Sequence, residues 1–363
     1  MTRARAAIYK SDIREKYGLP VVQDIGPLSQ AGYTKLARPR PAVKFNFGHT
    51  LGRVDTFGSQ PTFTVTAGHG QSYRVTVGVL LAADGVKSAT RAQLLGQRRA
   101  AAPAQDTGQA TYQVVLPRDK MVSDPEMMAL LDGNEATRWI GEKRPWIEYL
   151  VAAKTLYNMS SIQPDTNLAA APSATYTTKG FKGAMLRAVS DFCPLVQRLQ
   201  SLIPDGEVCQ WKLRVHELLP TWVHGGVALM GGACHPTLPH LNQGASMAIE
   251  DGAVLAEVLA RAPGSTPAAI NKCLQVYGLL RKERTTRLVE LAALSGRTLH
   301  LGQEETKEER DRQFPACRIK EGVVPDRMGI VRGPDDCSHN CMMEVGHKLA
   351  NCIKVGFSKG PEG

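Results

Sequence analysis

The chain has 363 residues, of which 43% are hydrophobic and 21% charged, and a formal net charge of +10 at pH 7. This composition excludes an intrinsically disordered chain, and the length suits one to three domains. No apolar run reaches the roughly 18 residues that span a bilayer, and the basic residues form no stripe within a nucleic-acid-binding module.

We therefore expect no membrane span and no nucleic-acid partner, and the sequence leaves the oligomeric state open. The basic N-terminus is followed by no apolar segment typical of a secretory signal, so we expect a cytoplasmic protein. In a reducing compartment the eight cysteines are expected to be free thiols.

Short strands are predicted over 43–47 and 63–65, and a longer strand over Tyr73–Ala83 (YRVTVGVLLAA). The longer segment begins with alternating valines and ends in an apolar run, a pattern that favours a strand entering a buried parallel sheet. Asp84-Gly85-Val86-Lys87-Ser88 and then Arg91 follow it. Alone, this pattern fits an ordinary Asp-Gly turn with a capping serine as well as it fits a functional site.

The middle of the chain begins with a polar, alanine-rich crossing over Gln97–Asp106. Strands are predicted over Thr111–Leu116 and Trp146–Val151. Helical spacing runs from Met185 to Ile203, and Pro194 should break or restart that helix.

Gly231–Asp251 (GGACHPTLPHLNQGASMAIED) follows a short buried strand predicted over Val227–Met230. Its turn-rich loop leads into a helix expected from Ala245 to about Ala260. Small residues at the helix start let a flat ligand approach the backbone. The free N–H groups and the positive end of the helix dipole would face that ligand and favour negative charge on it. The alternative is a plain loop followed by a core helix.

A long amphipathic helix is predicted over Thr266–Leu294, and its arginines are interpreted as a solvated face with local ion pairs. The polar tail contains Cys337, His339, Cys341, His347 and Cys352 in a spacing that matches no common structural zinc pattern. We expect a poorly ordered tail and no metal.

The ordered combination G-x-A-x-H-P, P, Q-G-A and A-I-E-D-G-A after Gly231, with D-G-x-x-S-x-x-R at Asp84, resembles the FAD-dependent aromatic hydroxylases, the group that includes salicylate and 4-hydroxybenzoate monooxygenases. The segments Lys10–Val22, Tyr157–Thr178 and Trp211–His224 resemble its fungal, salicylate hydroxylase-like branch. The resemblance covers about 10–294.

This resemblance implies an α/β (α+β) fold, with an incomplete FAD/NAD(P)-binding doubly wound domain and an inserted antiparallel-sheet substrate domain. The expected boundaries are 1–96 for a remnant of the FAD-binding domain, 107–212 for the substrate domain, 213–300 for the second part of the FAD-binding domain and 301–363 for the tail.

The resemblance also implies the site residues. The cofactor-binding candidates are Asp84, Gly85, Gly231, Gly232, Pro236, Gly244, Ala245 and Ser246. Tyr149 falls on a tyrosine that is often given a catalytic or substrate-orienting role. His235 is expected to be a satisfied loop histidine rather than a proton donor.

Three departures from the family pattern stand out. Gly232 occupies the position of an aspartate that binds the ribityl chain of FAD, and Tyr112-Gln113 falls where the family has a Tyr-Arg pair. No G-x-G-x-x-G opens a βαβ unit, so the N-terminal dinucleotide-binding unit is expected to be absent from this chain. A truncated gene, a degraded homologue and a flavin-free relative all remain open.

The leading hypothesis is an oxidoreductase, an FAD-dependent monooxygenase of secondary metabolism. It would hydroxylate a phenolic, enolic or other aromatic or polyketide-like small molecule with NAD(P)H and O2. The alternative is a flavin-free cyclase or isomerase, or an inactive ligand-binding homologue.

Overall fold

The computed structural model describes residues 5–6, 44–97, 103–133, 137–141, 143–152, 154–165, 177–299 and 308. The chain divides into two compact units. Unit 1 comprises Met1–Lys44, Asp106–Leu213 and Gly296–Ile330, and unit 2 comprises Phe45–Gln105, Arg214–Ser295 and Val331–Gly363. The cysteine-containing tail proposed to be poorly ordered lies outside the described residues.

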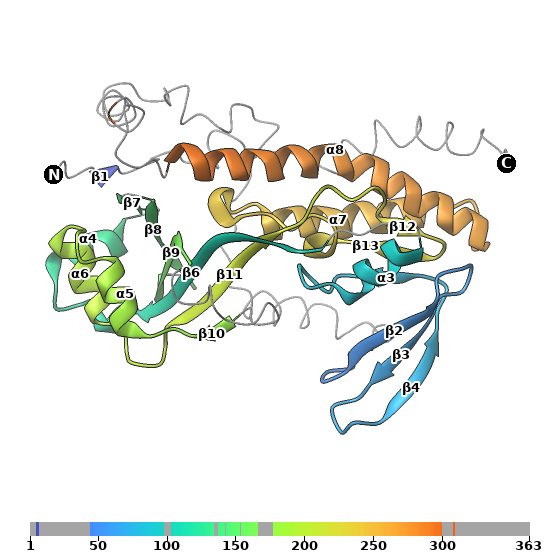
Figure 1. The fold of residues 1–363 in the computed structure, drawn as a ribbon, viewed down its shortest axis with the longest axis horizontal. Coiled ribbons are helices and arrows are strands. Elements are labelled where there is room, and N and C mark those ends of the chain that lie inside the picture. The colour runs from blue at the N-terminus through green and yellow to red at the C-terminus, as the bar shows by residue number, and fades with distance from the viewer. Residues whose placement is uncertain are drawn as a thin grey trace. The chain divides into compact units, whose positions relative to one another are not determined.

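Unit 1 is built on a seven-stranded sheet in the order β1-β7-β8-β9-β6-β11-β10 (Figure 1). Its strands are β1 Arg5–Ala6, β6 Gln105–Pro117, β7 Thr137–Gly141, β8 Arg144–Val151, β9 Leu156–Pro164, β10 Thr177–Lys179 and β11 Cys209–Val215. The pairs from β7 through β8 and β9 to β6 are all antiparallel. The predicted strands over 111–116 and 146–151 are confirmed, and each is longer than expected.

Helices cover one face of this sheet because alternate residues of the strands are apolar. These helices are η1 Arg118–Lys120, α4 Pro125–Asp132, α5 Lys182–Ala188 and α6 Pro194–Ser201. Tyr112, Trp139 and Met159 pack with Met185 and Leu199 in a shared core. Pro194 stands at the first turn of α6, which confirms the predicted break between two helices.

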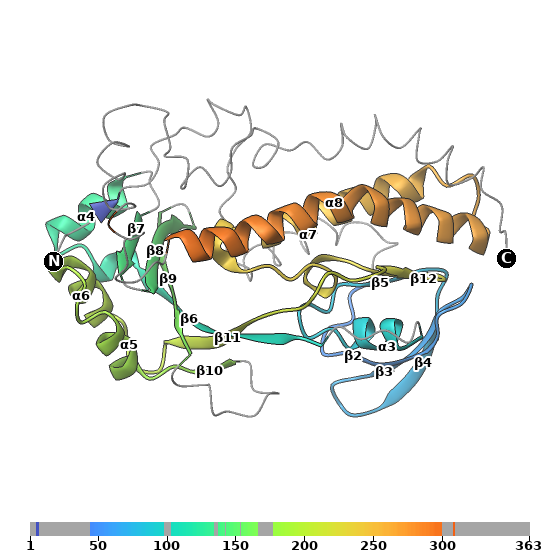
Figure 2. The same ribbon diagram turned by 45° about the horizontal axis from the view of Figure 1, so that its top comes forward.

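In unit 2, two small sheets are present (Figure 2). One is antiparallel, with β2 Thr50–Thr56, β3 Thr62–Thr66 and β4 Ser72–Thr76. The other holds β12 Val223–His224, β13 Val227–Leu229 and β5 Leu80–Ala82, and in it β13 runs parallel to β5.

The helical elements of unit 2 are α3 Ala89–Gln97, η2 Gly231–Ala233, η3 Pro239–Leu241, α7 Gly244–Ala260 and α8 Pro267–Leu299. Val227, Ala228 and Leu229 of β13 are fully buried and pack with Val254 of α7 and Tyr277 of α8. The predicted strand after 226, the helix after the glycine-rich loop and the long helix α8 are thus confirmed.

The prediction of one buried strand over Tyr73–Ala83 is wrong. The segment divides into β4, which pairs with β3 in an antiparallel hairpin and is largely exposed, and β5, which joins the parallel pair. The backbone changes partner at Gly78: the Val77 amide donates to the Pro61 carbonyl, whereas the Leu80 amide donates to Gly226. The alternating residues thus belong to the antiparallel sheet, and the apolar run belongs to the sheet with the parallel pair.

Residues 44–47 do not form the predicted strand, which begins instead at Thr50. The chain is a mixed α/β protein with an antiparallel sheet region, as expected. Among the described residues, none of the helices is both long enough and apolar enough to cross a membrane. The cysteines at 193, 209, 234 and 273 are free thiols, as predicted for them.

Glu148 of β8 is a buried carboxylate within the core of unit 1. Its Oε2 accepts hydrogen bonds from Trp139 Nε1 at 2.8 Å and from the Tyr157 hydroxyl at 3.1 Å, while Oε1 has no partner. Burial raises the pKa of Glu148 to about 7, although those two donors oppose the shift. A charge at this position is therefore costly to fold.

We predict that Glu148→Gln stabilises the protein at pH 8 and not at pH 5. The folded-state pKa lies above the unfolded one, so the stability linked to Glu148 is complete below pH 4.5 and is lost as the pH rises through about 7. The loss amounts to about 3 kcal/mol. Urea unfolding followed by tryptophan emission at both pH values measures it, and an equal difference between variant and parent at pH 5 and pH 8 would contradict the prediction.

Candidate functional site

The two glycine-containing turns singled out in the sequence meet at one edge of the parallel pair in unit 2. Asp84-Gly85 follows β5, and Gly231-Gly232 follows β13. The strands are in register at Ala82 and Leu229, and the Met230 amide donates to the Ala82 carbonyl at 3.0 Å. The carboxyl ends of adjacent parallel strands are the usual location of ligands in open α/β sheets.

Asp84 and Ser88 cap the start of α3. Asp84 Oδ1 accepts from the Ser88 hydroxyl at 2.5 Å and Oδ2 from the Thr90 amide at 3.1 Å, while the Arg91 amide donates to Ser88 Oγ at 2.8 Å. Gly85 has a φ of +74°, which favours glycine. The capping role weighed in the sequence is therefore present, and a cofactor-binding role for Asp84 and Gly85 stays a prediction.

Arg91 joins the two turns. Its guanidinium is buried and donates to the Val86 carbonyl at 2.7 Å in the first turn and to the Ala233 carbonyl at 3.2 Å in the second. The arginine of the D-G-x-x-S-x-x-R pattern thus fixes the distance between two backbone loops, which is a structural reason for its presence there.

The two glycines after β13 differ in what their backbone requires. Gly231 has a φ of +58°, and a Cβ there would lie 3.1 Å from the Ala248 Cβ of α7. Gly232 has no such conformation, and its nearest neighbour, Gly85 Cα, would lie 3.4 Å from an added Cβ, an ordinary contact. Position 231 therefore favours glycine, whereas position 232 accommodates a Cβ without strain.

The first turn of α7 is open to solvent. Gln243 precedes the helix without a side-chain cap, and Ala245 and Ser246 are exposed. Gly244 is half-buried against Thr237, and Pro236 is buried in the loop. A 17-residue helix with an uncapped start offers N–H donors and the positive end of its dipole to a ligand.

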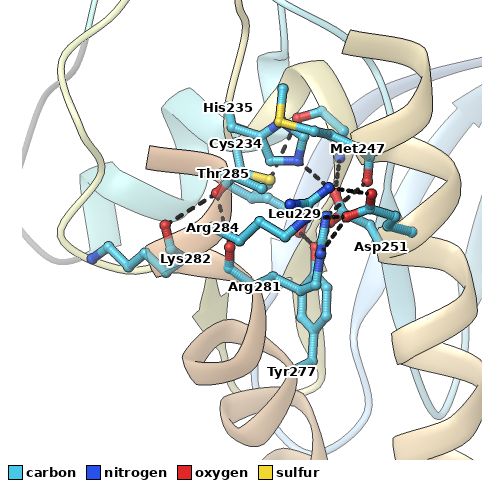
Figure 3. A network of polar contacts seen from close by, with 12 residues as sticks. Leu229, Cys234, His235, Met247, Asp251, Tyr277, Arg281, Lys282, Arg284 and Thr285 are labelled. Carbon is cyan, nitrogen blue, oxygen red and sulfur yellow. Dashed lines mark hydrogen bonds and ion pairs between the residues drawn. The ribbon is translucent and has the colours of Figure 1, made fainter. Parts of the chain in front are cut away.

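Asp251 anchors the loop that carries these glycines (Figure 3). Its Oδ2 accepts from the Gly231 amide at 2.8 Å and faces His235 Nε2 at 2.6 Å, and its Oδ1 accepts from Arg281 Nε at 2.8 Å. Burial opposes ionisation, but the His235 hydrogen bond and the charges of His235 and Arg281 outweigh it and hold the pKa of Asp251 below its usual value. Asp251 is therefore a buried anion that joins loop, α7 and α8.

The arginines of α8 correct the expectation of a solvated face. Arg281 is fully buried, pairs with Asp251, and lies 2.7 Å from Glu250 through its Nη1. Arg284 binds Glu250 through two contacts of 2.8 Å. Two carboxylates of α7 thus face two guanidiniums of α8, and the charges of these four groups balance.

Cys234, His235 and Asp251 place one candidate metal-ligand atom each within 4.8 Å of one another. Both oxygens of Asp251 are already used by Gly231, His235 and Arg281, and burial raises the pKa of the Cys234 thiol well above its usual value. A buried neutral thiol beside a carboxylate paired with arginine is a poor metal site.

Tyr149 lies in unit 1, apart in sequence from the eight candidates of unit 2. It stands on β8 directly opposite Asn158 of β9, on the sheet face away from Trp146 and Met159. Gln113 Nε2 donates to Asn158 Oδ1 at 2.9 Å, and the buried Asn158 Nδ2 has no hydrogen-bond partner. Burial raises the pKa of Tyr149. Two uncharged amides, Asn158 and Gln113, thus lie on the face of the predicted catalytic tyrosine, and Arg138 of β7, directly opposite Ile147, lies on the same face.

Sequence reasoning missed Asp251, Arg281 and Asn158. Asp251 was part of the A-I-E-D-G-A string, and its acidic residue inside an otherwise apolar helix was the available signal. Arg281 fell on the apolar spacing of α8, which indicated burial.

Comparison with known proteins identifies the family. The family described as "FAD binding domain" matches residues 34–292. The FAD-dependent monooxygenase ntnJ of Nectria sp is 32% identical over 235 residues, which are 65% of this chain and 54% of the relative. The chain spans about half the length of the curated relatives it matches.

Two solved structures share the fold. CtdE in complex with FAD and a substrate has a TM-score of 0.68 and 19% identity, over 86% of this chain and 70% of that one. A salicylate hydroxylase in a substrate complex has a TM-score of 0.64 and 22% identity, over 92% of this chain and 76% of that one.

We predict that Asp251→Asn destabilises unit 2 by about 3–5 kcal/mol, because it leaves Arg281 buried without its full countercharge. Chemical denaturation measures the loss. Glu257→Gln is the matched control, since Glu257 pairs with Arg261 at the exposed end of the same helix and its loss should cost below about 0.5 kcal/mol. Because the pKa of Asp251 is lowered, the stability that its charge contributes is fully present above the ordinary pKa of aspartate. That stability is lost as the pH falls through the lowered pKa. Equal effects of the two variants would contradict this assignment.

Proposed function

Because this chain belongs to the FAD-binding-domain family of flavoprotein monooxygenases, we propose that it binds FAD and hydroxylates an aromatic or enolic small molecule, with NAD(P)H and O2 as co-substrates. The observation that carries the proposal is the meeting of the Gly85 and Gly231-Gly232 turns at the carboxyl ends of two parallel strands, followed directly by the uncapped start of α7.

The residues present fit the ring of FAD better than its sugar chain. Three backbone positions around the turns are glycines, and the first turn of α7 is small and exposed, so a flat ring can approach the N–H groups. Gly232 offers no acceptor for a ribityl hydroxyl. One missing charge-assisted hydrogen bond corresponds to about 1.5–3 kcal/mol, so we expect weak FAD binding by this chain.

In the proposed roles, Gly244, Ala245 and Ser246 support the flavin ring through their N–H groups, and Pro236 lines the loop beside it. Asp84 and Gly85 hold the turn at which the two strands end. The bound cofactor supplies the reduction by NAD(P)H and the activation of O2. The protein supplies position and a fixed electrostatic field.

Unit 1 is the proposed substrate unit, and the interval 107–212 expected from the sequence is assigned to it as part of the proposal. Tyr149, Gln113 and Asn158 present uncharged hydrogen-bonding groups on one sheet face. This set offers hydrogen-bond partners for the hydroxyl of a phenolic or enolic compound. Fungal relatives such as ntnJ support a role in secondary metabolism.

A second candidate is a flavin-free cyclase or isomerase, or a ligand binder without redox chemistry. Gly232 specifically favours it, because it removes an anchor for the cofactor.

The deciding experiment is FAD titration of the purified chain, followed by NAD(P)H oxidation with a set of phenols. Bound FAD with a characteristic visible spectrum, and NAD(P)H oxidation stimulated by a phenol with formation of a hydroxylated product, supports the monooxygenase. A chain that takes up no FAD at saturating concentration contradicts it and favours the second candidate.

We predict that Gly232→Asp tightens FAD binding at least about ten-fold, through one restored charge-assisted hydrogen bond. A Cβ at position 232 meets only ordinary contacts, and the backbone there is not left-handed. Quenching of FAD fluorescence measures the dissociation constant. Gly264→Asp adds the same charge in an exposed loop with nothing within 4 Å and should leave affinity unchanged. Unchanged affinity in Gly232→Asp would remove the ribityl role from this position.

A further inference from the structure

The sheet of unit 1 gathers polar side chains on the face away from its helices. Tyr149 of β8 lies directly opposite Asn158 of β9, and one row further along Gln113 of β6 lies opposite Ser160 of β9. Residues two apart on a strand share a face, so these four side chains lie on the same one. Tyr149, Gln113 and Ser160 are half-buried, whereas Asn158 is only 1% exposed. The face therefore encloses one amide among side chains that solvent still reaches.

The Asn158 amide is bound at its oxygen and not at its nitrogen. Gln113 Nε2 donates to Asn158 Oδ1 at 2.9 Å. Among the described residues, no group accepts a hydrogen bond from Asn158 Nδ2. A buried donor without an acceptor destabilises the fold, so such a group calls for a bound molecule that accepts from it. Asn158 thus presents an unused donor on this face.

Gln113 decides which atom of Asn158 is left for a ligand. A primary amide offers a donor at one end and an acceptor at the other, so it presents whichever end its neighbour does not take. Here Gln113 takes the oxygen, and the NH2 group remains. A ligand group that accepts, such as a carbonyl oxygen, therefore matches this face, whereas a group that only donates finds no partner at Asn158.

A positive charge lies on the same face. Arg138 of β7 stands opposite Ile147 of β8, in the row that continues through Ser160 to Gln113. Burial lowers the pKa of Arg138 to about 10, which leaves the guanidinium charged at neutral pH. Arg138 has contacts of its own, so no ligand contact is assigned to it. Its charge still favours an electron-rich oxygen in a nearby ligand.

We propose that Asn158 is a specificity-determining residue whose Nδ2 donates to a carbonyl oxygen of the ligand, and that Gln113 is the positioning residue that sets its orientation. The ligand is then an aromatic or enolic compound with a carbonyl group attached to the ring, such as a hydroxylated aryl ketone. The inference rests on the proposed function for placing the substrate in unit 1, and it narrows the class of that substrate. A phenol without a carbonyl offers Nδ2 only the weakly accepting oxygen of its hydroxyl.

The test compares two probes of nearly equal shape, 4-hydroxyacetophenone and 4-ethylphenol, which differ by a carbonyl oxygen. Calorimetric titration of the full chain without FAD measures both dissociation constants. We expect the parent chain to bind the ketone at least about ten-fold more tightly, because a site with a buried donor discriminates against a ligand that leaves it unpaired. Equal affinity for the two, the result expected if water alone occupies the position next to Nδ2, would overturn the proposal. So would the absence of binding at saturating concentration.

Two variants assign the preference to named groups. Asn158→Leu keeps the approximate volume of the side chain and removes the donor, so its affinities for the two probes should lie within about two-fold of each other. Gln113→Glu offers Asn158 only acceptors, so the amide should turn until Nδ2 faces position 113 and Oδ1 faces the ligand. The preference for the ketone should then disappear although Asn158 itself is unchanged.

Gln275→Glu is the matched control. Gln275 Nε2 donates to Asn271 Oδ1 at 3.0 Å in the same kind of pair, but on the exposed surface of α8 in unit 2. This variant should retain the preference of the parent chain. A preference that survives in Asn158→Leu would overturn the role of Asn158, and one that survives in Gln113→Glu would overturn the positioning role of Gln113.

A second measurement needs only the parent chain and so does not depend on the folding of a variant. In the infrared spectrum, the carbonyl stretching band of isotope-labelled 4-hydroxyacetophenone should lie at lower wavenumber when bound to the chain than in an apolar solvent. The reason is that a hydrogen bond to the carbonyl oxygen weakens the C=O bond. A band at the position found in the apolar solvent would overturn the proposal.

These readouts involve neither FAD nor turnover, so the two proposals fail separately. A chain that prefers the ketone but takes up no FAD contradicts the monooxygenase and supports the assignment of Asn158. A chain that binds FAD and oxidises NAD(P)H with a phenol, but shows equal affinity for the two probes, refutes only the role of Asn158 and Gln113.

Discussion

The ion pair between Asp251 and Arg281 is the interaction on which unit 2 depends. A buried carboxylate and a buried guanidinium are each costly to remove from water, and they are tolerable only when every polar atom finds a partner. Asp251 meets this condition by taking donors from three places: the backbone after β13, the ring of His235 and the side chain of Arg281. The position of the glycine turn relative to α7 and α8 is therefore set by charge as well as by packing.

This arrangement has a chemical side. The carboxylate that anchors the loop also lies 2.6 Å from His235 Nε2, so one side chain holds both the backbone after β13 and the ring of His235. Arg91 joins the two turns in a comparable way, through one backbone carbonyl of each. Backbone loops that must approach a ligand closely cannot carry bulky side chains of their own, and here their rigidity is supplied by side chains from elsewhere in the sequence.

Much of this was predictable from local patterns. Glycines before a small-residue helix predicted α7, and Pro194 predicted the boundary between α5 and α6, because these residues act on the backbone where they stand. The division of Tyr73–Ala83 between two sheets could not be predicted. An alternating pattern indicates a strand with two different faces, but it does not indicate which neighbouring strand it pairs with. Arg281 was misjudged for a related reason: a charged residue in an amphipathic helix indicates solvent unless its partner, 30 residues away in sequence, is known.

The contrast between the adjacent glycines has an evolutionary consequence. Gly231 has a positive φ and lies against Ala248, so almost any replacement there strains the loop. Neither constraint applies to Gly232. Codons for glycine and aspartate can differ by a single base. Under the role proposed for position 232, one mutational step changes the affinity for the coenzyme without any rebuilding of the scaffold around it.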